Sequence, residues 1–64
     1  MGIIDTVENF GRALKVPELA RLTAISTKTI YRHIAQGKLP AFHIGGCVRL
    51  EPKATADWLR SRLA

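Results

Sequence analysis

Acidic side chains are missing from the middle of this 64-residue sequence. None of its five Asp and Glu residues lies between Leu19 and Leu50. The sequence has ten Lys and Arg residues and a net charge of +5. Outside the central segment the basic residues are balanced by the five acidic ones. The net charge therefore belongs to the central segment, whereas a merely solvated surface usually mixes both signs. This segregation favours a polyanionic partner over the alternative, an accident of a small basic chain.

Other absences narrow the class of protein further. A single cysteine, Cys47, excludes a disulfide within the chain, and no apolar run is long enough to span a membrane. The length allows one small domain without a deep substrate cavity. A hydrophobic content of 47% is typical of an ordered fold. We therefore expect an intracellular, cytoplasmic protein with one folded domain.

The N-terminal segment, residues 1–13, leaves two interpretations open. Ile3, Val7 and Phe10 have roughly helical spacing, but a glycine follows directly. The segment is expected to be either a short helix or a loosely ordered arm. Residues 14–64 are expected to form the folded domain.

Two short helices are predicted next. The first begins near Pro17, because proline suits the first helical turn. Ser26 is a good N-cap for the second helix, and Gly37 is a good residue to end it. About three residues separate the two helices, which is the helix-turn-helix pattern.

The second helix would carry a polar stripe without acidic residues. Its isoleucines, Ile30 and Ile34, share one side with Thr27 and are expected to pack inward. Arginine and lysine contact phosphates or guanine edges, and glutamine pairs with adenine. A solvated face is the alternative, but such a face gains from glutamate partners that are absent here. The residues nearly opposite the isoleucines are Lys28, Arg32 and Gln36, with Thr29 and His33 on one flank and Tyr31 on the other.

Residues 41–50 are expected to form a β-hairpin, because apolar residues alternate on both sides of Gly45 and Gly46. A two-residue turn would leave the apolar residues of the two strands on opposite faces. A three-residue loop that includes Cys47 would let them bury together, so we predict that loop. The predicted pairs are Ile44 with Val48, His43 with Arg49 and Phe42 with Leu50.

The last helix is expected to open at Glu51-Pro52. Thr55, Trp58, Leu59 and Arg62 recur at helical spacing along one face. Trp58 is the largest apolar side chain and is expected to fill the core. Stacking of its indole on a nucleic-acid base is the alternative.

Taken together, residues 14–63 resemble the excisionase-type winged helix-turn-helix domain, a small relative of the MerR DNA-binding domain. The fold class implied is mainly α with a small β-hairpin. The stretches that carry the resemblance are Leu14 to Val16, Ser26, Ile30-Tyr31-Arg32, Gly37-Lys38-Leu39-Pro40, Phe42, Gly45-Gly46, Arg49-Leu50 and Trp58-Leu59.

This resemblance implies a DNA interface built from the second helix and the hairpin, or wing. Two features depart from the family pattern. Cys47 stands at the wing tip where Arg or Lys is frequent, and Pro52 and Ala54 open the last helix in place of the usual basic and acidic residues. Helix initiation there is assigned to Pro52. The expected contacts from the second helix are Thr27, Lys28, Thr29, Tyr31, Arg32 and Gln36, and those from the wing are Lys38, His43, Gly45, Gly46 and Arg49.

The chemistry of an enzyme is not supported by these residues. His43 and Cys47 would lie on an open hairpin without a pocket, and their spacing does not suit a zinc site. We expect no catalytic residue, no metal and no cofactor. The predicted partner is double-stranded DNA, together with an integrase or further copies of the chain. The expected role is that of an excisionase-like recombination directionality factor associated with the nucleoid; a small transcriptional regulator and a protein-interaction adaptor are the alternatives.

Overall fold

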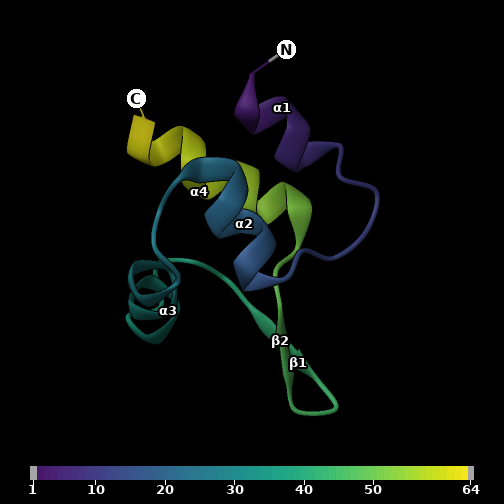
Figure 1. Ribbon diagram of the computed structural model, residues 1–64, viewed down its shortest axis with the longest axis vertical. Coiled ribbons are helices and arrows are strands. Elements are labelled where there is room, and N and C mark those ends of the chain that lie inside the picture. Colours follow the sequence, from purple (N-terminus) through teal and green to yellow (C-terminus); the bar gives the residue numbers. More distant parts are fainter. Residues whose placement is uncertain (1, 64) are drawn as a thin grey trace.

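The computed structural model describes residues 2–63, with Leu63 as backbone alone. Figure 1 shows the helices gathered at one end and the hairpin projecting away from them. This arrangement confirms the predicted fold class, a mainly helical winged helix-turn-helix with a two-stranded antiparallel hairpin. Along the described residues the elements are α1 (Ile3–Glu8), α2 (Val16–Thr23), α3 (Thr27–Ala35), β1 (Phe42–Ile44), β2 (Cys47–Arg49) and α4 (Pro52–Leu63).

The boundaries of α2 follow from local chemistry. Pro17 lies in its first turn, as predicted. The Lys15 N–H donates to Glu18 Oε1 at 2.9 Å, so the glutamate satisfies one of the free donors at the helix start. The helix ends at Ala24, which adopts a left-handed conformation with φ of 60°. That conformation reverses the chain toward α3 and costs alanine on the order of 1 kcal/mol.

Both predicted ends of α3 are confirmed. The Thr29 N–H donates to Ser26 Oγ at 3.2 Å, which makes Ser26 the N-cap. At the other end Gly37 has a φ of +74°, and its N–H donates to the Ile34 carbonyl at 3.0 Å. The Lys38 N–H donates to the His33 carbonyl at 3.0 Å. These two bonds form a Schellman motif, which needs a residue that tolerates positive φ.

A core formed by all four helices and the residues around the hairpin holds the fold together. α1 belongs to it, because Val7 is fully buried and Phe10 packs against the same cluster. An ion pair from Glu8 to Arg60 also ties α1 to α4. The buried apolar residues of the core are Val7, Leu14, Val16, Leu19, Ile30, Leu39, Leu50, Ala56, Trp58 and Leu59.

The hairpin differs from the prediction in its turn. Ile44 and Cys47 pair directly across a two-residue turn formed by Gly45 and Gly46. Both glycines have positive φ, 55° and 84°, as a type I′ turn requires. The predicted three-residue loop is therefore wrong, and so is its cross-strand pair of a histidine with an arginine. The observed pairs are Phe42 with Arg49, His43 with Val48 and Ile44 with Cys47.

The expectation that the apolar residues of the hairpin bury together is also wrong. Phe42 is 39% exposed and Ile44 is 60% exposed. Val48 is half-buried against the core. Leu50 is fully buried in the core, and its backbone forms an isolated antiparallel bridge with Leu14, with N–H to carbonyl distances of 2.9 Å in both directions. The wing is therefore attached to the helices through the backbone bridge between Leu14 and Leu50, and it has no hydrophobic core of its own.

The start of α4 also needs a correction. Initiation was assigned to Pro52 alone, yet the carboxylate of Glu51 accepts hydrogen bonds from the first turn. The Lys53 N–H donates to Glu51 Oε1 at 3.0 Å, and the Ala54 N–H donates to Oε2 at 2.6 Å. A carboxylate here also favours the positive end of the helix dipole.

Candidate nucleic-acid interface

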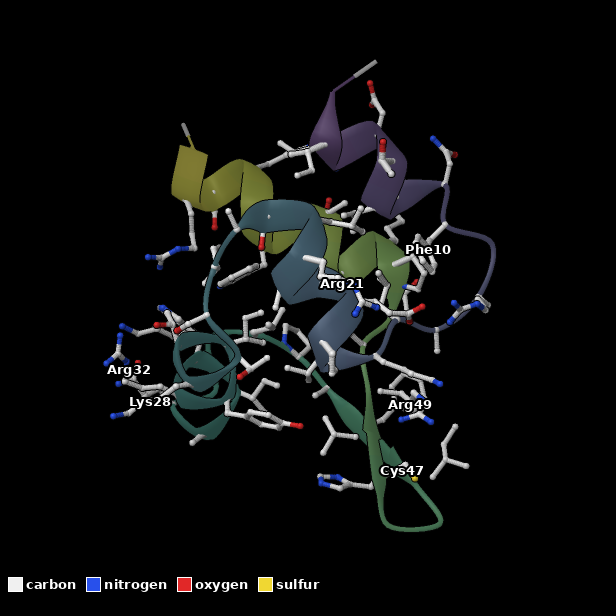
Figure 2. The ribbon with its side chains drawn as sticks, viewed as in Figure 1. Phe10, Arg21, Lys28, Arg32, Cys47 and Arg49 are labelled. Carbon is white, nitrogen blue, oxygen red and sulfur yellow. The ribbon has the colours of Figure 1, made fainter. Side chains whose placement is uncertain are left out.

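The polar stripe of α3, defined as Lys28, Arg32 and Gln36, is exposed to solvent. Figure 2 shows Lys28 and Arg32 on the same side of α3, pointing away from α2. Thr27, which shares the side of the two isoleucines in the helical projection, is nevertheless exposed, and Tyr31 is 48% exposed. The structure thus brings these predicted residues to one outer surface of α3.

Thr29 lies closer to the protein than the stripe does. Its side chain is half-buried, and Ser26 Oγ donates to Thr29 Oγ1 at 3.0 Å. The threonine therefore supports the N-cap of α3.

His33 departs from the sequence analysis, which placed it on the flank of the stripe. Its side chain is only 7% exposed and meets the Trp58 ring edge-on, with ring centroids 5.5 Å apart. Burial lowers the pKa of the imidazole, and the nearby positive charges of Arg62, Lys38 and Arg32 lower it further. The neutral form is therefore favoured, and His33 is a packing residue between α3 and α4.

The predicted wing residues occupy two different faces of the hairpin. His43 is exposed and shares its face with Val48, the residue opposite it. Arg49 lies on the other face, and Figure 2 shows it together with Cys47 on the side turned away from α3. The Arg49 guanidinium donates to the Val48 carbonyl at 2.9 Å, which holds it close to the strand. The remaining predicted wing residues, Lys38, Gly45 and Gly46, are exposed.

Ion pairs divide the basic residues into two groups. Hydrogen bonds from the Arg12 guanidinium and from the Lys15 backbone lower the pKa of Glu18 to about 2, so this carboxylate is ionised at neutral pH. Among residues 2–63, the ion pairs join Arg12 to Glu18, and Lys53 and Arg60 each to Glu8 and Asp57. The other seven of the ten Lys and Arg residues pair with none of the five acidic side chains; they are Lys15, Arg21, Lys28, Arg32, Lys38, Arg49 and Arg62.

Three residues of this unpaired group, Lys15, Arg21 and Arg62, were not singled out from the sequence as contacts. The Leu14–Leu50 bridge places Lys15 across from Arg49, because these are the next residues along the two antiparallel segments. Arg21 is exposed on α2, where Figure 2 shows it. The sequence indicates only weakly that these basic residues are unpaired, because that depends on which other residues the acidic side chains bind in the folded protein.

A pocket of about 390 Å³ lies beside the wing, and the charged side chains that line it are Glu8, Arg12, Glu51 and Lys53. Its two carboxylates, from Glu8 and Glu51, are engaged in the ion pair with Arg60 and in the capping of α4. Within residues 2–63 no group of three or more metal-ligating side chains gathers. No helix in that range is long and apolar enough to cross a membrane.

The comparison with known families agrees with this geometry. Residues 13–63 match the family described as "Helix-turn-helix domain", a span that holds α2, α3, the hairpin and α4. The chain therefore belongs to the helix-turn-helix domain family.

Two mycobacterial proteins are similar to the chain. They are "Putative DNA-binding protein Rv0500A" of Mycobacterium tuberculosis strain H37Rv and "Putative DNA-binding protein MT0521" of strain CDC 1551. Each is 33% identical over 60 residues, which cover 94% of this chain and 77% of the relative. No solved structure matches the chain significantly.

Proposed function

We propose that this protein binds double-stranded DNA in a sequence-specific manner, with α3 lying in the major groove. The observation that carries the proposal is that no acidic side chain neutralises the polar stripe of α3. A helix that only faced water would gain from such pairs. The names of the mycobacterial relatives, which describe DNA binding, support the same function.

Each part of the interface has a distinct role in this proposal. Arg32, Lys28 and Gln36 reach base edges, because their side chains are long, exposed and on one side of α3. Thr27 and Tyr31 contact the flanking phosphates. The wing contacts the sugar–phosphate backbone through Lys38, His43, the amides of Gly45 and Gly46, and Arg49.

The salt dependence of binding tests the proposed function. If each of the five Lys and Arg residues of the acid-free central segment neutralises one phosphate charge, the logarithm of the binding constant should fall with the logarithm of salt concentration with a slope of about −4 to −5. Fluorescence anisotropy with labelled duplexes across a series of KCl concentrations measures this slope. Binding that does not change between low and physiological salt would rule out DNA as the partner.

Within DNA binding, we propose the role of an excisionase-like recombination directionality factor that binds cooperatively and bends its site. One short recognition helix and one small wing bury only roughly 600–1,000 Å² on DNA, which is little for tight and selective binding by one copy. Adjacent copies or a DNA-bound integrase would supply the missing selectivity. A small MerR-like transcriptional regulator is the second candidate, and an adaptor that binds only proteins is the third.

The assembly pattern separates these candidates. We expect a monomer in sedimentation velocity without DNA, because in this proposal the copies associate only when they occupy adjacent sites on the DNA. Gel shifts on a fragment with several sites should then give stepwise, cooperative bands. A tight dimer that occupies one palindromic site would favour the regulator, and an absence of any shifted band would favour the adaptor.

A further inference from the structure

The last turn of α4 carries two arginines, Arg60 and Arg62, that differ in their ion pairs. Arg60 pairs with Glu8 and Asp57, on the side of α4 that faces α1. Arg62 is exposed and pairs with none of the five acidic side chains. The two arginines therefore have the same charge and lie on the same helix, but among the acidic side chains of residues 2–63 only Arg60 has partners.

The position of Arg62 is fixed by the core rather than by an acid. Its guanidinium carbon lies 5.5 Å from the centre of the Trp58 ring, a cation–π arrangement. Trp58 is itself only 6% exposed and contacts His33 of α3. A guanidinium stacked in this way keeps its N–H donors available at its edge and loses little freedom when it binds an anion.

Arg62 also lies near α3, because the Trp58 ring beneath its guanidinium packs against His33 of that helix. The charge of Arg62, like the charges of Lys38 and Arg32, lowers the pKa of the buried His33 imidazole, so all three cations act on the same ring. Like charges gathered without an acid repel one another, and a phosphate placed among them would relieve that repulsion.

We propose that Arg62 is a phosphate-binding residue, through which the end of α4 extends the DNA interface beyond α3 and the wing. This inference rests on the proposed function. The site is non-specific in sequence, because a guanidinium at this position meets the backbone that flanks the groove rather than the bases within it.

The test compares Arg62→Ala with Arg60→Ala, which lower the net charge equally. Arg62→Ala should make the salt slope less negative by about 0.9 and weaken binding about fivefold at 0.15 M salt, equally on target and random duplexes. Arg60→Ala should leave the slope unchanged, and Arg62→Lys should retain it. Circular dichroism checks that each variant is folded; if Arg62→Ala is not, Arg62→Gln gives the same comparison with a longer side chain.

The outcomes distinguish this inference from the proposed function. A wild-type slope of about −4 to −5 that persists in a folded variant without the Arg62 charge would overturn the role of Arg62 alone. A wild-type protein without salt-dependent binding would overturn both. Equal slope changes for the Arg60 and Arg62 variants would show that net charge, not position, determines the effect and would likewise overturn the inference.

Discussion

Replacing Trp58 with alanine should unfold most of the protein near physiological temperature. Trp58 is 6% exposed and connects α4 to α3 through His33. Truncation of a buried tryptophan to alanine costs about 3–5 kcal/mol. The total stability of a domain of this length is roughly 3–10 kcal/mol, so the loss is comparable to the whole. Thermal unfolding followed by far-UV circular dichroism should show a melting temperature lower by about 12 °C or more.

Tyr31→Ala is the matched control for this prediction. Tyr31 is also aromatic, but it is 48% exposed on the outer side of α3. Its truncation should change stability by no more than about 0.5 kcal/mol, as is usual for a surface position. If both variants melt at the wild-type temperature, Trp58 does not hold the core together.

Replacing Arg32 with alanine should abolish most of the discrimination between target and random DNA. Arg32 lies in the polar stripe that we place against base edges, and a good side-chain contact to a base contributes about 1–3 kcal/mol of discrimination. The ratio of the two dissociation constants should therefore fall by roughly 5- to 150-fold. The target duplex is first selected from a random pool with the wild-type protein, and both affinities are then measured at the same salt concentration.

Arg49→Ala provides the contrast. Arg49 lies on the wing, on the face turned away from α3, and the proposed contact there is to the backbone. Its removal should weaken binding to target and random duplexes by the same factor, so the ratio should stay near that of the wild type. If Arg32→Ala also weakens both duplexes equally, the assignment of base reading to α3 is wrong.

Local chemistry made the helix-turn-helix predictable from the sequence. Ser26 and Gly37 act through hydrogen bonds to residues three or four positions away, and such bonds depend little on the rest of the fold. The spacing of Ile30 and Ile34 likewise placed the polar stripe on the outside. Membership of the family agrees with this local reading, since the match spans α2 through α4.

The features that the sequence did not reveal depend on distant contacts. The predicted three-residue loop would bury Phe42 and Ile44, but no second layer covers the wing, and both side chains are exposed. The preference of a Gly-Gly pair for a type I′ turn then decides the register. His33 became a core residue because Trp58 from α4 covers it.

The ion pairs also could not be predicted from the order of charged residues in the sequence. The ion pair of Glu8 with Arg60 joins residues 52 positions apart. Spacing alone therefore could not show which arginine of the last helix is neutralised. It placed Arg62 in the apolar register of α4, whereas the structure leaves its guanidinium on the surface above Trp58.

The separation of paired from unpaired basic residues gives the protein an electric dipole moment. Its neutralised end is where α1 meets α4, and its positive end includes α3, the wing and the exposed side of α2. In the electric field of a polyanion, a molecule with this dipole moment rotates during its approach, so that its positive surface, which includes α3, faces the polyanion at first contact. Encounters in the wrong orientation become rarer, and association at low salt proceeds faster than for a molecule of the same net charge spread evenly.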